Sequence, residues 1–148
     1  MRIAVISDTH GKFPPSVAAS IARADEIWHL GDVTTEPLLQ TVRELGPPLR
    51  VVRGNCDFCF DWPETVDLQL AGMQIRLVHI PPPLAPPGTD LLLHGHTHVP
   101  RDQRVGSARF LNPGCLNKAN KGAPPSYGWL ELQEGEPVGW KIVRVSAS

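Results

Sequence analysis

Residues 1–10 read Met-Arg-Ile-Ala-Val-Ile-Ser-Asp-Thr-His, where a short run of apolar β-formers, Ile3–Ile6, leads directly into a polar turn. An apolar run of this length, ended by polar residues, is typical of a buried strand. We expect a helix next, because Pro14 and Pro15 can open one and the apolar residues of 17–22 have helical spacing.

The same alternation continues through the front half of the chain. Glu26–Leu30 has the character of a second strand and Glu36–Leu45 that of a second helix, with Gly46-Pro47 after it. Leu49–Val52 follows as a third strand. This strand–helix–strand–helix–strand order predicts a parallel sheet with right-handed crossovers.

The back half is mostly β. Val66–Leu70 and Gln74–Val78 flank a hairpin signal at 71–73. Further strands are expected at Asp90–His94, Val105–Leu111, Tyr127–Leu132 and Val138–Val145. The proline-dense segment Ile80–Thr89 cannot hold a regular helix and is expected to be an extended loop. The simplest packing is an α/β fold with two sheets face to face and helices outside.

Composition sets the protein class. The 148 residues suit a single domain spanning 1–148, and 41% hydrophobic with 20% charged residues is ordinary for a globular chain. A formal net charge of −1 argues against an extended nucleic-acid partner. The stretch 101–121 is locally basic, through Arg101, Arg104, Arg109, Lys118 and Lys121. It is either solvated surface or a rim for an anionic substrate.

Location is predicted from the cysteines and the apolar runs. An odd number of cysteines, Cys56, Cys59 and Cys115, argues against a disulfide framework. The apolar run near the N-terminus is too short for a signal peptide, and no run of 18 apolar residues could span a membrane. We therefore expect a cytoplasmic protein that does not enter a membrane.

Five short polar segments each follow an expected strand. They are Asp8-Thr9-His10, Gly31-Asp32, Gly54-Asn55, His79 and Gly95-His96-Thr97-His98. The ends of parallel strands are where α/β sheets place ligands. In an extended backbone, residues i and i+2 point the same way, so the Asp8/His10 and His96/His98 pairs are each expected to converge.

Together these segments supply seven candidate metal ligands. They are Asp8, His10, Asp32, Asn55, His79, His96 and His98. Imidazole, carboxylate and amide groups suit first-row divalent ions, and seven ligands are too many for one tetrahedral ion. If Asp32 bridges two ions, each receives four protein ligands, which leaves positions for water and substrate. Any one segment alone would more often be structural.

The ordered set resembles the calcineurin-like metallophosphoesterase superfamily, and especially its small prokaryotic phosphodiesterase branch. The motifs that carry the resemblance are Ile-Ser-Asp-Thr-His-Gly (6–11), His-Leu-Gly-Asp-Val (29–33), Arg-Gly-Asn-Cys-Asp (53–57), Gly-His-Thr-His-Val-Pro (95–100) and Asn-Pro-Gly (112–114). The resemblance implies a four-layer α/β/β/α sandwich with a dinuclear site. Asp8, His10 and His98 would bind one ion, Asn55, His79 and His96 the other, and Asp32 both. The implied ions are manganese, nickel, iron or zinc.

We therefore expect a metal-dependent phosphoesterase, with phosphodiesters favoured over monoesters. Two close cations can activate a shared water, so a metal-bridging hydroxide would attack phosphorus, with Asp32, Asn55 and His96 taking part in catalysis. The partner would be a small phosphate ester, and exposed strand edges in the C-terminal half make a homo-oligomer an open expectation. The alternative is a non-catalytic scaffold of the same fold for protein–protein interaction, in which loss of metal ligands would be expected.

Some positions depart from the family pattern or leave alternatives open. Cys56 stands where larger relatives have a histidine that assists the leaving group, and a redox role for Cys56-x-x-Cys59 has little support. Ile80 replaces the glycine that usually follows His79. His29 and His94 are expected in core or supporting roles. Asp57 either orients a ligand or closes a turn, and Arg53 either pairs with a carboxylate or touches phosphate.

Overall fold

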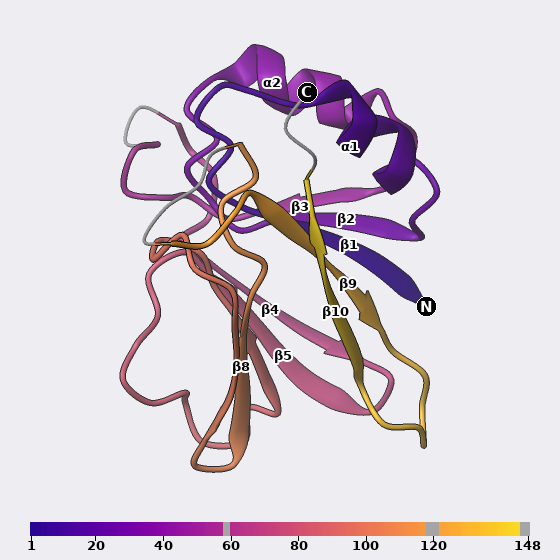
Figure 1. Cartoon of the computed structure of the whole chain (residues 1–148). Helices are drawn as coiled ribbons and strands as arrows, with labels where there is room; N and C mark the ends of the chain where they lie inside the picture. The colour runs from indigo at the N-terminus through magenta and orange to yellow at the C-terminus, as the bar shows by residue number, and fades with distance from the viewer. Residues whose placement is uncertain (58–59, 118–121, 146–148) are drawn as a thin grey trace.

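The computed structural model describes residues 1–57, 60–117 and 122–145. Its first sheet has the strand order β10-β9-β1-β2-β3 (Figure 1). The strands are β1 (Arg2–Ile6), β2 (Glu26–His29), β3 (Leu49–Val51), β9 (Ser126–Glu131) and β10 (Gly139–Arg144). The first three are parallel, as predicted, and are connected through α1 (Pro15–Ile21) and α2 (Glu36–Arg43). Strand β9 pairs antiparallel with β1, and β10 with β9.

The second sheet has the order β4-β5-β6-β8-β7. Its strands are β4 (Thr65–Leu70), β5 (Met73–Val78), β6 (Leu91–Leu93), β7 (Arg101–Val105) and β8 (Ala108–Asn112). The predicted β4–β5 hairpin is confirmed. The single strand predicted at Val105–Leu111 is wrong, because the chain reverses at Gly106-Ser107 and forms the β7–β8 hairpin. Gly106 has a φ of 63°, which such a tight reversal favours.

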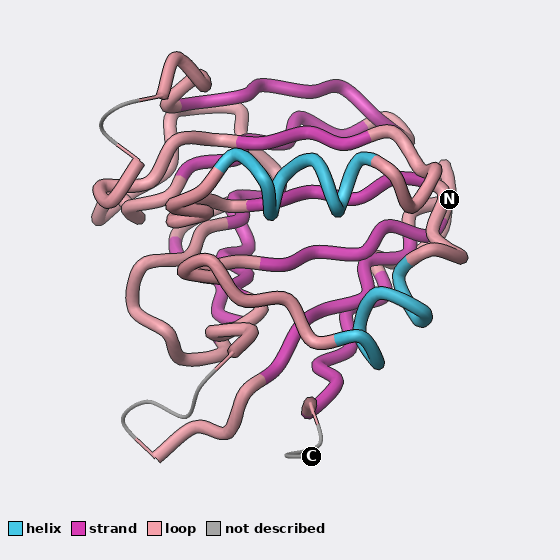
Figure 2. The backbone as a smooth tube through the Cα atoms, turned by 90° about the horizontal axis from the view of Figure 1, so that it is seen from above, coloured by secondary structure: helices cyan, strands magenta, loops and turns pink. Residues whose placement is uncertain are grey.

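Strand β1 is buried on both faces, and its alternation separates two cores. Ile3 and Val5 lie between the two sheets, in a cluster that contains Trp28 from the first sheet and Leu77 from the second. Ala4 and Ile6 point to the opposite face. There they meet the apolar sides of the helices, Val17 and Ile21 from α1 and Leu38, Leu39 and Val42 from α2. Both helices therefore cover the same face of the first sheet (Figure 2).

The outer face of the second sheet has a different cover. Residues 80–89 form neither helix nor strand, as their proline content predicted. Ala85 from this segment packs against Leu92 and Phe110 of the sheet. Two sheets thus pack face to face with helices outside one and an extended loop against the other. No helix among the described residues combines the length and the apolar character needed to cross a bilayer.

Candidate metal centre

All seven predicted ligands lie just beyond the carboxyl ends of strands. In the first sheet, Asp8 and His10 follow β1, Asp32 follows β2 and Asn55 follows β3. In the second sheet, His79 directly follows β5, and His96 and His98 come after β6. Because the two sheets meet face to face, these loops from distant parts of the chain come together at one edge, and the seven side chains form two adjoining groups.

The first group contains Asp8, His10, Asp32 and His98. One donor atom from each lies within 4.8 Å of the others. Asp8 Oδ1 is 3.2 Å from His98 Nε2, and His10 Nε2 is 3.7 Å from Asp32 Oδ2. Among the described residues, the buried atoms Asp8 Oδ1 and His10 Nε2 have no hydrogen-bond partner. Buried polar atoms are seldom left so, and two of them facing one small space fit a cation.

The second group gathers around the side-chain oxygen of Asn55. His79 Nε2 lies 3.0 Å and His96 Nδ1 3.1 Å from Asn55 Oδ1. Asp32 Oδ2 is 3.3 Å from His79 Nε2. The same carboxylate oxygen therefore faces His10 in the first group and His79 in the second, so Asp32 lies between the two groups.

The hydrogen bonds of His79 also fit a cation. Its Nδ1 donates to the carbonyl oxygen of Leu30 at 2.7 Å, which leaves the Nε2 lone pair directed at the oxygens of Asn55 and Asp32. Three acceptor atoms facing one another without a proton repel. A cation or a proton among them relieves the repulsion, and a backbone carbonyl on the far nitrogen is how metal-binding histidines are commonly oriented.

The backbone at the site adopts conformations that are rare for residues other than glycine. Five of the seven candidate ligands have positive φ: Asp8 (56°), His10 (45°), Asp32 (59°), His96 (72°) and His98 (65°). We expected the side chains at i and i+2 to converge because of an extended backbone. That reason is wrong, because the backbone at these residues is in the left-handed region. The expected convergence is also wrong for His96 and His98, which join different groups. Backbone strain of this kind concentrates at functional sites.

Burial and neighbouring charges shift the two carboxylates in opposite directions. Burial raises the pKa of Asp8 to about 6, above its usual 3.8. Burial also acts to raise that of Asp32, but contacts from His79 and the backbone N–H of Cys56 outweigh it and lower the pKa to about 2. Burial would lower the pKa of His79, yet the carboxylates of Asp32 and Asp8 raise it. Without cations, Asp8 is thus a buried charge with too little compensation.

Asp57 organises the loops that carry Asp32 and Asn55. Its buried carboxylate accepts hydrogen bonds from the backbone N–H groups of Asp32, Val33, Thr34 and Gly54, at 2.8–3.3 Å. Asp57 fits both roles left open for it, because it orients the loop of Asp32 and also closes the turn at 54–57, where its backbone N–H donates to the Gly54 carbonyl at 3.0 Å. Gly54 packs so closely that an added Cβ would collide with the Asp32 side chain and backbone N. The glycine of this motif is thus needed for the approach of two loops.

Hydrogen bonds from Asn112 and His94 hold the loop that carries His96 and His98. The carbonyl oxygen of Gly95 accepts hydrogen bonds from Nδ2 of Asn112 (3.3 Å) and Nδ1 of His94 (2.9 Å), and Asn112 also donates to Oγ1 of Thr97 (2.9 Å). The role of Asn112 could not be deduced from the residue itself. Its only signal was the Asn-Pro-Gly motif, because the contacts join segments from different strands.

The remaining histidines have supporting roles, as predicted. His29 is fully buried and hydrogen-bonds to Thr9 Oγ1 and the N–H of Gly31. Burial lowers the pKa of His29 to about 3 and that of His94 to about 4, so both are neutral at physiological pH. Each braces a loop that carries candidate ligands.

The arginines of the basic stretch make contacts in and beside the β7–β8 hairpin. Arg109 forms a two-pronged contact with Asp102, and Arg101 donates to His94 and Gln103. Arg104 donates to the Ser107 carbonyl. These arginines belong to the β7–β8 hairpin, whereas Lys118 and Lys121 lie outside the described residues.

Two of the three cysteines, Cys56 and Cys115, lie in the described part of the chain. Cys56 is exposed and Cys115 is buried, neither is in a disulfide within the described ranges, and Cys59 lies outside them. Partial burial and the carboxylates of Asp32 and Asp57 raise the pKa of the Cys56 thiol. At neutral pH it is therefore neither a reactive thiolate nor a ready proton donor.

Comparison with known proteins places this site in a family. Residues 1–135 match the model of the calcineurin-like phosphoesterase superfamily domain. A probable metallophosphoesterase of Methanocaldococcus jannaschii is 30% identical over 131 residues, covering 77% of this chain and 67% of that protein. The phosphodiesterase YfcE of Escherichia coli K12 is 29% identical over 161 residues, covering 88% of each.

Solved structures agree with this assignment. The E. coli phosphoesterase YfcE superimposes with a TM-score of 0.74 at 25% identity over 88% of each chain. Vps29 of Entamoeba histolytica, in a single-mutant form, has the same fold, with a TM-score of 0.78 at 22% identity over 99% of this chain and 100% of that one. With its sheet order, its clustered aspartates and histidines and a family match over most of its length, the chain belongs to the calcineurin-like phosphoesterase superfamily.

Proposed function

We propose that this protein is a dinuclear metal-dependent phosphoesterase that hydrolyses a small phosphodiester. The observation that carries the proposal is the position of Asp32, whose Oδ2 lies between His10 of one group and His79 of the other. Asp8, His10 and His98 would hold one divalent ion, and Asn55, His79 and His96 the other, with Asp32 shared. Manganese, nickel, iron or zinc would suit this mixture of nitrogen and oxygen donors.

Two ions at this site would lower the pKa of a shared water and neutralise charge on the phosphoryl oxygens. The chain's own residues fix where this happens. The N–H of Cys56 holds Oδ1 of Asp32, so Oδ2 stays directed at the two groups. The Leu30 carbonyl orients His79. Asn55 and His96, at the open side of the site and exposed to solvent, are the residues we assign to contact with the substrate phosphate.

Protonation of the departing alcohol has no dedicated acid among the described residues around this site. Cys56 occupies the position where larger relatives carry a histidine, and its raised pKa makes the thiol a weak donor. Substrates with good leaving groups should therefore react fastest, with solvent supplying the proton.

The test is hydrolysis of bis(p-nitrophenyl) phosphate beside p-nitrophenyl phosphate. Chelator-stripped protein is assayed with manganese, nickel, zinc or magnesium added back, and bound metal is counted per chain. We expect two ions per chain, metal-dependent turnover and a higher rate with the diester. The Asp32→Asn variant should lose turnover, whereas Asp61→Asn, a change at an exposed carboxylate, should keep it. A wild-type protein that binds no metal would end the proposal.

A protein-binding scaffold is the second candidate. Ile80 and Leu84, in the loop beyond His79, are 51% and 68% exposed, so this loop offers two apolar side chains to a partner. The seven intact ligand positions favour catalysis. Two ions bound per chain without turnover on either substrate would favour the scaffold instead.

Other expectations remain predictions. We expect a single domain over 1–148, a cytoplasmic location and a homo-oligomer. Size-exclusion chromatography with light scattering would measure the oligomeric state directly.

A further inference from the structure

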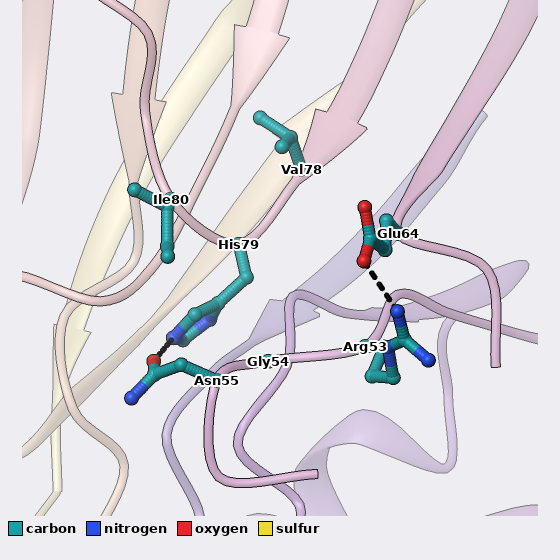
Figure 3. Close-up of a pocket in the computed structure, with 7 residues that line it drawn as sticks. All are labelled: Arg53, Gly54, Asn55, Glu64, Val78, His79 and Ile80. Carbon is teal, nitrogen blue, oxygen red and sulfur yellow. Dashed lines mark hydrogen bonds and ion pairs between the residues drawn. The ribbon is translucent and has the colours of Figure 1, made fainter. Parts of the chain in front are cut away.

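A cavity of about 430 Å³ lies beside the proposed metal centre (Figure 3). Two candidate ligands, Asn55 and His79, are among the residues that line it. It extends between the segment after β3 and the end of β5, so both sheets contribute walls. Its volume is in the lower part of the range for small-molecule sites, which leaves ample room for an alcohol group of a few carbon atoms.

The walls of the cavity differ in chemistry. Val78 and Ile80 supply an apolar surface at the end of β5. Across from them, Arg53 and Glu64 form an ion pair through Nη2 and Oε1 (Figure 3). The sequence left two roles for Arg53, pairing with a carboxylate or touching phosphate, and in the structure it pairs.

The pair leaves hydrogen-bonding capacity directed at the cavity. A guanidinium has five N–H donors, and within residues 1–57, 60–117 and 122–145 the side chain of Arg53 hydrogen-bonds only to Glu64. The Glu64 side chain is 74% exposed and can accept further bonds. Donor and acceptor thus lie side by side, and their charges cancel. A second anionic group on a ligand would meet Glu64, whereas a hydroxyl can accept from Arg53 and donate to Glu64.

We propose that this cavity receives one alcohol group of the phosphodiester substrate, and that Arg53 and Glu64 select a neutral, hydroxyl-bearing group such as glycerol or ribose. The proposal rests on the function proposed above, because the phosphate must lie at the metal centre beside Asn55, which also lines the cavity. Val78 and Ile80 pack against the carbon skeleton of the group, while the ion pair reads its hydroxyls.

If the Arg53–Glu64 pair were only structural, its loss would affect folding and not the choice of ligand. Exposed ion pairs contribute little to folding, so variants at Arg53 and Glu64 should fold normally. The pair Arg76–Asp67 offers a matched control, since its arginine side chain is equally exposed at 32% and its aspartate is 60% exposed, and neither residue lines this cavity. Only the Arg53–Glu64 pair should affect which ligand binds.

The test is calorimetric titration of the manganese-loaded protein with four phosphate monoesters. Propyl phosphate, glycerol 3-phosphate, ribose 5-phosphate and 2-carboxyethyl phosphate share the phosphate and differ in the group that would enter the cavity. We expect glycerol 3-phosphate or ribose 5-phosphate to bind roughly tenfold more tightly than propyl phosphate, the gain of one or two hydrogen bonds. The ester that binds more tightly of these two identifies whether the cavity receives a glycerol or a ribose group. The carboxyethyl ester should bind most weakly.

Variants of the ion pair test whether Arg53 and Glu64 cause the preference. Arg53→Met should remove the preference for hydroxyls, and Glu64→Gln should improve binding of the carboxyethyl ester severalfold by leaving the arginine charge uncompensated. Asp67→Asn should leave all four affinities unchanged. Equal binding of the propyl and glycerol esters, or a preference that survives both variants, would overturn this inference alone. Failure to bind manganese or inorganic phosphate would overturn the proposed function and this inference with it.

Discussion

Replacing Asp8 by asparagine should stabilise the metal-free protein. Asp8 is fully buried, and burial raises its pKa from 3.8 to about 6. Each pKa unit corresponds to about 1.4 kcal/mol, so the ionised carboxylate lowers the free energy of unfolding by about 3 kcal/mol above pH 6. An asparagine removes the charge and keeps an oxygen for the donors Ser7 Oγ and His96 N–H. It also tolerates the φ of 56° at this position.

The sign of the pH dependence follows from where the proton is held. Between about pH 4 and pH 6, the folded chain keeps a proton on Asp8 that the unfolded chain has released. The stability that comes from holding this proton is fully present below pH 4 and is lost as the pH rises through 6. The gain in stability of Asp8→Asn over the wild type should therefore be near zero at pH 4 and reach its full value above pH 6.

Asp32→Asn should behave in the opposite way. The pKa of Asp32 is lowered to about 2, so its ionised form stabilises the fold above pH 3.8 and that contribution is lost as the pH falls through 2. Asp32→Asn should therefore destabilise the metal-free protein at neutral pH. Both variants should lose the extra stability that wild type gains from added metal, about 2.7 kcal/mol at a hundredfold excess over Kd.

Urea unfolding of chelator-treated protein at pH 4, 6 and 7.5, repeated with manganese, measures these differences. Asp61→Asn controls for a generic Asp-to-Asn change at an exposed position. If metal-free Asp8→Asn proves no more stable than wild type at pH 7.5, the view of Asp8 as an uncompensated buried charge is refuted.

Three substitutions test how the loops around the site are held. Gly54→Ala should destabilise the fold by about 1–3 kcal/mol and weaken metal binding, because its Cβ collides with Asp32; thermal unfolding and metal titration measure both. Asp57→Ala should lower the free energy of unfolding by more than about 2 kcal/mol in urea, because four backbone N–H groups lose their acceptor; an unchanged midpoint would contradict this. Asn112→Ala should weaken metal binding by releasing the Gly95 carbonyl and Thr97, and a metal affinity equal to that of wild type would count against it.

Local sequence patterns predict the strands and the ligand positions for the same physical reason. A buried parallel strand must be apolar, and the polar residues just after it mark the sheet edge where ligands collect, so Ile3–Ile6 indicates the segment that contains Asp8. The pattern fails at the β7–β8 hairpin, because β7 (Arg101–Val105) has a single apolar residue, Val105, and so carries no apolar pattern to set it apart from the reversal at Gly106-Ser107.

The grouping of the ligands could not be predicted from local pattern. His96 and His98 are two residues apart, yet they face different groups, because both have a left-handed backbone that changes the direction of the side chains. The role of Asp57 likewise depends on Thr34 and Asp32, which are 23 and 25 positions away in the chain. Contacts of that kind arise only when the loops after separate strands meet.

The separation of core and site leads to a last prediction, that the protein stays folded without metal. The clusters around Ile3 and Val5 and around Ala4 and Ile6 are built mainly from strands and helices, whereas the seven candidate ligands lie in the segments that follow the strand ends. Metal binding should therefore relieve charge and strain at an edge of the fold rather than create the core, unlike small zinc domains that unfold when stripped. Chelator-treated protein should keep its far-UV circular dichroism and unfold cooperatively at a lower Tm. Loss of the folded spectrum on chelation would mean that the ligand loops hold the two sheets together.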